Sequence, residues 1–231
     1  MSNQVGGVIF NVSGTVLDYG SRGPVAVLME LFRGKGIELS EEEARRMPWP
    51  EEGFNIEVLR EYCDLIPGVV ELTGELRAQG IRFANTTGFH SLVMEELKRS
   101  AEEAGYKPDA WVSPDMVGGV GRPAPWMAFH AARAMGVYPM SRVVKVGDTL
   151  EDIDEANAAG MWAVSVVRHG NEVGLSQQVL NALPRSESGA RLRAARERLA
   201  EGKPHFIIDS TADLMPVLSE ISWRLSRGER P

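Results

Sequence analysis

The sequence of 231 residues contains a single cysteine, Cys63, so an intrachain disulfide is excluded. A chain without disulfides is typical of a reducing compartment, and we predict a cytoplasmic location. No apolar run approaches the roughly 20 residues that a membrane span needs, so no membrane partner is expected. The first residues have no basic segment followed by an apolar stretch, so we expect no secretory signal.

An excess of basic residues is also missing. Lysine and arginine number 25 against 32 aspartates and glutamates, which gives a net charge of −7. Because proteins that bind a polyanion are usually basic, we expect no nucleic-acid partner. Apolar residues make up 43% and charged residues 25%, which is ordinary globular usage and excludes a disordered or collagen-like chain. The length suits one domain, or one domain with a small insert.

Short β-branched runs alternate with helical patterns along most of the chain. The runs are apolar at most positions, which is typical of strands that are covered on both faces of a parallel sheet. They lie at 7–10, 81–86, 110–112, 143–146, 163–167 and 205–208. The main helical patterns lie at 69–78, 92–104, 126–135, 150–159 and 212–225. This order predicts an α/β fold with a doubly wound parallel sheet.

Two segments interrupt this alternation. Residues 21–66 separate the first strand from its crossover helix, and they are too many for a connection of the usual ~4–6 residues. They contain helical patterns at 25–32, 41–46 and 56–65, and Ser40 with Glu43 forms a capping-box signal for the second. We predict a core domain of residues 1–20 and 67–231 with a small helical cap of residues 21–66 over the carboxyl end of the sheet. Residues 176–202 are polar and predict a solvated helix pair.

Polar residues gather where four of the predicted strands end. In an open α/β sheet, ligands bind outside the carboxyl ends of the strands. The side chains and loops there offer carboxylates, hydroxyls, a guanidinium and backbone N–H groups, which suit a phosphate and a divalent cation. The candidates are Asn11, Ser13, Thr15, Thr86, Thr87, Gly88, Arg122, Asp148 and Asp152.

These segments resemble motifs one to four of the haloacid dehalogenase (HAD) superfamily and, more closely, the phosphonoacetaldehyde hydrolases, or phosphonatases. The likeness is carried by the segments at 8–20, 86–88, 121–127, 137–149 and 157–162. It covers nearly the whole chain outside the insert. It implies a HAD-like Rossmannoid core and a hydrolase that acts with Mg²⁺ on a small phosphonate or phosphorylated metabolite. It also implies a homodimer that forms through the cap.

The resemblance implies a role for each candidate. Asn11 stands at the position of the nucleophilic aspartate, and the backbone carbonyl of Ser13 would face Mg²⁺ together with Asp148 and Asp152. Thr86 and Arg122 would hold phosphoryl oxygens. The substrate-binding group is completed by residues next to these: Thr15, Thr87, Gly88 and His90. His90 is equally compatible with a partly buried position at the surface.

The sequence departs from the phosphonatase pattern at two places. A carboxamide such as Asn11 is a poor nucleophile, and it removes a negative ligand from the metal site. Phosphonatases also use a cap lysine that forms a Schiff base with the aldehyde, but no lysine lies between positions 36 and 63. Lys35 lies in a turn-like Gly-Lys-Gly segment, and the insert is shorter than a phosphonatase cap. Covalent chemistry by this chain should therefore be absent or very slow.

Three hypotheses for the function stay open. In the first, Asn11 is an engineered replacement of aspartate, and the natural protein is a Mg²⁺-dependent hydrolase of a phosphonate or phosphate ester. In the second, the protein is a natural, non-hydrolytic relative that binds a phosphorylated ligand or a partner protein. In the third, Asp148, Asp152 and a metal activate water for hydrolysis without a covalent step.

Overall fold

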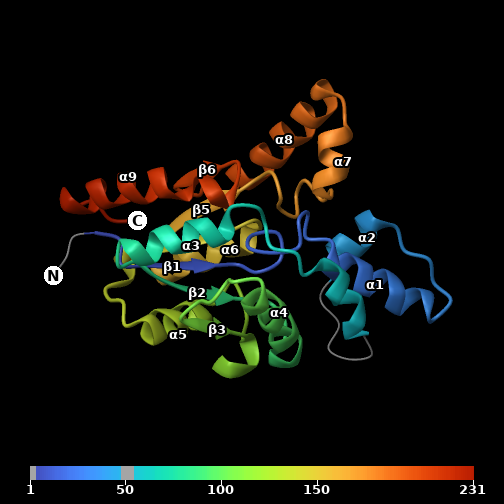
Figure 1. The fold of residues 1–231 in the computed structure, drawn as a ribbon, viewed down its shortest axis with the longest axis horizontal. Coiled ribbons are helices and arrows are strands. Elements are labelled where there is room, and N and C mark those ends of the chain that lie inside the picture. Colours follow the sequence, from blue (N-terminus) through green and yellow to red (C-terminus); the bar gives the residue numbers. More distant parts are fainter. Residues whose placement is uncertain (1–3, 48–54) are drawn as a thin grey trace.

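A computed structural model describes residues 4–47 and 55–231. Its centre is a six-stranded sheet in the order β3-β2-β1-β4-β5-β6, and every neighbouring pair is parallel. The strands are β1 (Gly7–Phe10), β2 (Arg82–Thr86), β3 (Ala110–Val112), β4 (Val143–Gly147), β5 (Trp162–Val166) and β6 (Phe206–Ile208). The predicted doubly wound α/β fold is confirmed (Figure 1).

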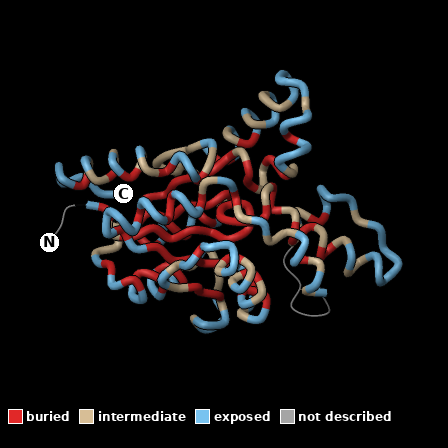
Figure 2. Tube along the Cα trace, viewed as in Figure 1, coloured by how far each residue is buried: buried red, intermediate tan, exposed pale blue. Residues whose placement is uncertain are grey.

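Helices cover both faces of this sheet. On one face, α3 (Val69–Ala78), α4 (Ser91–Glu103) and α9 (Leu214–Ser226) pack on Val8, Phe10 and their neighbours. On the other face, α5 (Trp126–Met135) and α6 (Leu150–Ala159) pack on Ile9 and Ala163. Because β1 and β4 lie in the middle and are buried on both faces, they show no polar alternation (Figure 2).

The described part of the insert holds three helical elements. They are α1 (Gly23–Arg33), α2 (Glu41–Arg46) and the 3₁₀ helix η1 (Ile56–Tyr62). α1 and α2 enclose a small apolar cluster of their own around Val25, Leu28 and Ala44. They lie beyond one end of the sheet (Figure 1). The predicted boundaries of the cap and the core stay predictions, since residues 1–3 and 48–54 lie outside the described residues.

Most element bounds agree with the sequence patterns, and two differ for a physical reason. The helix expected over 56–65 is a 3₁₀ helix that ends at Tyr62, because Leu65 forms an antiparallel bridge with Leu17. The helix expected over 212–225 begins at Leu214, after a 3₁₀ turn, η4 (Thr211–Asp213). The capping box of Ser40 and Glu43 is confirmed.

The polar segment after β5 forms the helix pair that its composition predicts. It consists of α7 (Gln177–Ala182) and α8 (Arg185–Ala200). In α8 only Ala195 and Leu199 are buried, and the rest of the pair is largely exposed (Figure 2). None of the helices within residues 4–47 and 55–231 is both long and apolar enough to cross a membrane. Two further 3₁₀ turns, η2 (Pro114–Val117) and η3 (Met140–Arg142), complete the fold.

Candidate functional site

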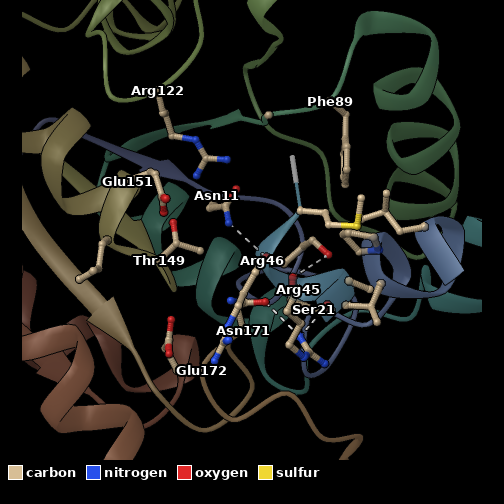
Figure 3. A pocket seen from close by; sticks show the side chains of 18 of the residues that line it. Asn11, Ser21, Arg45, Arg46, Phe89, Arg122, Thr149, Glu151, Asn171 and Glu172 are labelled. Carbon is tan, nitrogen blue, oxygen red and sulfur yellow. Dashed lines mark hydrogen bonds between the residues drawn. The ribbon is translucent and has the colours of Figure 1, made fainter. Parts of the chain in front are cut away.

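A cavity of about 1000 Å³ lies at the carboxyl ends of the strands, between the sheet and the cap (Figure 3). The core contributes loops that follow β1, β2, β3, β4 and β5, and the cap contributes α1 and α2. Lining residues from the predicted set are Asn11, Ser13, Thr87, Gly88 and Arg122. The cavity therefore lies where the parallel topology predicts a ligand site.

Asn11 follows β1 directly and is buried. Its Nδ2 atom lies 2.8 Å from Oδ1 of Asp148 and 3.1 Å from the backbone oxygen of Ser13. Because a carboxylate and a carbonyl only accept hydrogen bonds, both contacts require the NH₂ group at this end of the amide. Asn11 is thus a donor that joins two of the oxygens that the resemblance assigned to the metal.

Asp148 follows β4 and has no exposed surface. Its Oδ1 also accepts from the hydroxyl of Thr15 at 2.8 Å, and its Oδ2 accepts from the backbone N–H of Asn171 at 2.9 Å. Burial, followed by the nearby charge of Asp152, raises the pKa of Asp148 well above its usual range. Thr15 therefore holds Asp148, and it does not line the cavity where we expected it to bind substrate.

A buried chain of ionic contacts lies beside Asp148. Arg122 donates to Asp152, and Nζ of Lys145 lies 3.2 Å from the same carboxylate oxygen. Lys145 also lies 2.6 Å from Oε2 of Glu155. Burial opposes ionisation of Asp152, but the charges of Arg122 and Lys145 hold its pKa below the usual range. Asp152 also accepts from Thr149, so its carboxylate has protein partners on both oxygens.

The residues after β2 serve different purposes. The hydroxyl of Thr86 is buried and lies 2.5 Å from Nζ of Lys145, so Thr86 belongs to the ionic chain and does not line the cavity. Thr87 and Gly88 do line it. A Cβ added at Gly88 would lie 3.3 Å from Nη2 of Arg122, so the glycine lets the backbone approach the guanidinium closely. Of the two expected phosphoryl binders, Arg122 lines the cavity and Thr86 does not, while Thr87 and Gly88 from the expected substrate-binding group line it beside Arg122.

The expectation that His90 belongs to the substrate site is not supported by its position. His90 precedes α4 as its N-cap, is exposed, and does not line the cavity. Its Nε2 lies 3.6 Å from Oδ2 of Asp115. The alternative, a histidine at the protein surface, agrees with this position, and the His90 side chain caps the beginning of α4.

Arg45 on α2 is a functional candidate that the sequence did not indicate. Its Nη1 donates to the backbone oxygens of Gly20 and Ser21 and, at 3.0 Å, to Oδ1 of Asn171. Its Nη2 donates to the oxygen of Gly174 at 2.9 Å. The side chain therefore ties the cap to two core loops at the cavity wall (Figure 3). No short motif identifies such a residue, because its partners are mostly backbone oxygens from distant segments.

His169 is a second residue that sequence reasoning missed. Its Nδ1 lies 2.7 Å from the backbone oxygen of Gly14, and its Nε2 accepts from the backbone N–H of Thr211 at 3.0 Å. These partners require the neutral ring with its proton on Nδ1. Burial lowers the pKa of His169 to about 4, consistent with that form. The ring thus supports the loop that carries Asn11 and Ser13.

Asp18 anchors the beginning of the cap. Its carboxylate accepts from the backbone N–H groups of Arg22 and Gly23 at 2.9 and 2.8 Å, and from the hydroxyl of Ser13. Negative charge at a helix N-terminus is favourable, and here it fixes the start of α1 relative to the Ser13 loop. The Ser13 side chain therefore has a structural partner.

The residues at this site do not fit a tightly held Mg²⁺ ion. Mg²⁺ sites combine carboxylates with other oxygens in octahedral geometry. Here Asn11 presents N–H donors to Ser13 and Asp148, and Asp152 is engaged by Arg122 and Lys145. Within residues 4–47 and 55–231, no group of three or more histidine, cysteine, aspartate or glutamate side chains could hold a metal ion.

The cavity carries charge of both signs. Its arginines are Arg45, Arg46, Arg122 and Arg198, and its carboxylates are Glu42, Glu151 and Glu172. No lysine of the described residues lines it, and Lys35 lies exposed at the end of α1. The arrangement can bind and orient an anion, whereas it offers no side-chain amine for a Schiff base.

Comparison with known proteins agrees with this geometry. The model of the haloacid dehalogenase-like hydrolase family matches residues 14–160. A phosphonoacetaldehyde hydrolase-like protein of Syntrophobacter fumaroxidans is 34% identical, over 98% of this chain and 95% of the relative. A phosphonoacetaldehyde hydrolase of Bacillus cereus is 33% identical, over 93% of this chain and 95% of the relative.

Solved structures give the same result. A phosphonoacetaldehyde hydrolase-like protein of Oleispira antarctica superposes with a TM-score of 0.93 at 33% identity, and the match covers 100% of this chain and 97% of the other. The similarity therefore extends over the cap as well as the core.

Proposed function

Because the chain belongs to the haloacid dehalogenase-like hydrolase family and is phosphonatase-like within it, we propose that it binds a small phosphonate or phosphate monoester in the cavity beneath the cap. We further propose that Asn11 keeps this chain from forming an aspartyl-phosphate. The observation that carries the proposal is the wall formed by Arg122, Thr87 and Gly88 next to Asn11.

Arg122 is the main anion-binding group of this proposal. A guanidinium has five N–H donors in a planar fork, so a contact through Nη1 to Asp152 leaves donors that can reach a phosphoryl oxygen. Its side chain is 14% exposed, which keeps it close to solvent-accessible space while most of its surroundings are protein. Asp152 holds the guanidinium in place before the ligand arrives, which lowers the ordering cost of binding.

The chemistry next to Arg122 favours binding over covalent turnover. The Asn11 amide is neutral, and its NH₂ end contacts Asp148 and Ser13, so it cannot act as a carboxylate nucleophile. An imine route has no amine, since no lysine of the described residues lines the cavity and the buried Lys145 is engaged by Thr86, Asp152 and Glu155. We therefore place phosphonoacetaldehyde outside the substrates of this chain.

The cap limits the rest of the ligand. Pro24, Val25, Leu28, Ala44 and Met47 form the apolar part of the wall that the cap contributes. An apolar wall favours a carbon skeleton on that side of the cavity. A methyl, vinyl or benzyl phosphonate can place its carbon substituent there.

The test is ligand binding without turnover. Titration calorimetry with methylphosphonate, inorganic phosphate and phenyl phosphate should give saturable binding to the chain. Arg122→Ala should weaken this binding at least about tenfold, since charge-assisted bonds contribute about 1.5–3 kcal/mol each. Arg133→Ala, which changes an exposed arginine on α5, is the matched control and should leave binding unchanged.

Hydrolysis is measured in the same preparations. We expect no phosphate release by the chain as it stands, with or without Mg²⁺, and release by Asn11→Asp from a panel of acyl phosphates, phosphate esters and phosphonates. Release by the unmodified chain at the rate of Asn11→Asp would overturn the proposal. If neither form releases phosphate but both still bind the ligand, the result favours a protein whose natural role is binding.

Two further expectations from the sequence stay part of this proposal. We propose a cytoplasmic protein, on the strength of its single cysteine. We also propose a homodimer that forms through the cap, and sedimentation of the full chain measures whether it is a dimer.

A further inference from the structure

We propose that the carboxamide of Asn11 takes the place of a divalent cation, so that this chain assembles its anion pocket without a metal ion. Hydrolases of this family generally use a divalent metal. The inference deepens the proposed function and rests on it for the identity of the pocket, but its central test is metal binding.

The position of the amide carries the argument. Nδ2 of Asn11 lies 2.8 Å from Oδ1 of Asp148 and 3.1 Å from the oxygen of Ser13. The Ser13 oxygen comes from the loop after β1 and the Asp148 oxygen from the loop after β4. A bound cation can hold a carboxylate and a carbonyl oxygen together in a buried site. Here an N–H pair holds both.

Two further hydrogen-bond donors contact Asp148. Thr15 donates to Oδ1 and the backbone of Asn171 donates to Oδ2. Asp148 therefore accepts three hydrogen bonds although no part of it is exposed. A buried carboxylate with this many donors is satisfied without a metal.

A second carboxylate for the metal is not supplied by Asp152. Its oxygens accept from Arg122, Lys145 and Thr149. The two cations neutralise it, and a further cation beside them would be repelled. The site thus offers a metal ion one carboxylate, that of Asp148. The phosphonatase pattern would offer two, because an aspartate would stand at position 11.

Asn11→Asp reverses this arrangement. It replaces the N–H donors by a second carboxylate oxygen directed at Oδ1 of Asp148. Two carboxylates at hydrogen-bond distance repel strongly in a buried site, and either a proton or a cation must lie between them. The substitution should therefore create a divalent-metal site from the same loop geometry.

The experiment is a titration with Mn²⁺, followed by electron paramagnetic resonance of the free ion, on chain that has been dialysed against a chelator. The unmodified chain should show no saturable site in the micromolar range. Asn11→Asp should bind one Mn²⁺ at least about tenfold more tightly, the size of effect that changes around a metal site produce. Mg²⁺ should raise the melting temperature of Asn11→Asp alone.

Asn171→Asp is the matched control. It adds one negative charge to the same cavity wall, but its side chain contacts Arg45 and does not lie between Ser13 and Asp148. If added charge alone attracted the ion, both variants would bind Mn²⁺ alike, and the inference would be overturned. A tight Mn²⁺ site in the unmodified chain would overturn it as well, whatever the behaviour of the variants.

Phosphate binding separates this inference from the proposed function. We expect inorganic phosphate to bind the unmodified chain equally in chelator and in Mg²⁺. Binding only in Mg²⁺ would contradict the metal-free pocket and leave the anion site standing. Absence of phosphonate and phosphate binding under both conditions would contradict the proposed function, while the Mn²⁺ titration would still decide the role of Asn11.

Discussion

Nζ of Lys145 lies 2.6 Å from Oε2 of Glu155, and both side chains are almost fully buried. Lys145 comes from β4 and Glu155 from α6, so the pair joins a central strand to the helix that follows it. The ammonium also contacts Asp152 and the hydroxyl of Thr86. The same lysine therefore connects the helix, the acidic partner of the anion-binding arginine, and the end of β2.

Removal of this lysine should destabilise the fold. Lys145→Met leaves the buried carboxylate of Glu155 without its cation and removes one of the two cations that pair with Asp152. Breaking one partner of a buried pair costs about 3–5 kcal/mol. Oε1 of Glu155 already has no hydrogen-bond partner among the described residues, and Oε2 would keep only the Thr86 hydroxyl at 3.4 Å, so a neutral donor replaces the cation. Urea unfolding followed by circular dichroism measures the difference.

The controls test whether the cost comes from burial. Lys98→Met removes an ammonium that contacts Glu95 at the surface of α4, and it should cost at most about 0.5 kcal/mol. Adding Glu155→Leu to Lys145→Met should recover part of the stability, because the uncompensated charge disappears. A Lys145→Met cost no larger than that of Lys98→Met would contradict the ionic chain.

Arg45 should control how firmly the cap is held against the core. Its four hydrogen bonds to Gly20, Ser21, Asn171 and Gly174 connect α2 to the loops after β1 and β5. Arg45→Lys keeps the charge but lacks the planar fork, so it should lose most of these contacts. We expect faster amide exchange over 41–47 with little change in exchange in the sheet.

Arg46→Lys is the neighbouring control for this effect. Arg46 pairs with Glu42 on the same short helix, and both side chains are exposed. Its exchange rates should match those of the unmodified chain. Equal exchange in Arg45→Lys and Arg46→Lys would show that the cap is held by its apolar contacts alone.

The sequence predicts the sheet and the carboxyl-end location of the site because both depend on local patterns. The apolar run of β1 is followed directly by Asn11, and β4 is followed directly by Asp148. Each site residue is therefore next to the strand that positions it. The roles of Thr15, Thr86 and Arg45 could not be predicted in this way. Thr15 and Thr86 contact residues 133 and 59 positions away, so their partners exist only in the folded chain.

Gly14 should be intolerant of any side chain. Its φ is +74°, and an added Cβ would lie 2.2 Å from Oδ2 of Asp148. Gly36 has nearly the same backbone, with φ +77°, but an added Cβ meets nothing within 4 Å. Gly36→Ala should therefore cost only the left-handed strain of about 1–2 kcal/mol. Gly14→Ala should cost clearly more and should also lose ligand binding, as denaturant unfolding and calorimetry will measure.

His169 should make stability fall in mild acid. Its pKa is about 4 in the folded protein, against 6.5 for an ordinary histidine, because burial disfavours the charged ring. Between these two values the unfolded chain binds a proton that the folded chain does not. The stabilisation is therefore complete above about pH 6.5 and is lost as the pH falls toward 4. At about 1.4 kcal/mol per pKa unit, the total loss reaches about 3 kcal/mol.

His169→Gln tests this prediction, because glutamine can donate to Gly14 and accept from Thr211 but does not titrate. Unfolding free energies at intervals from pH 7 to pH 4 should fall less steeply for His169→Gln than for the unmodified chain. Asp148 contributes in the opposite direction, since its raised pKa lets the folded state bind the extra proton. That contribution is common to both proteins and cancels in their difference. His130→Gln, at an exposed position of α5, should follow the unmodified chain, and equal slopes in all three proteins would exclude His169 as the source.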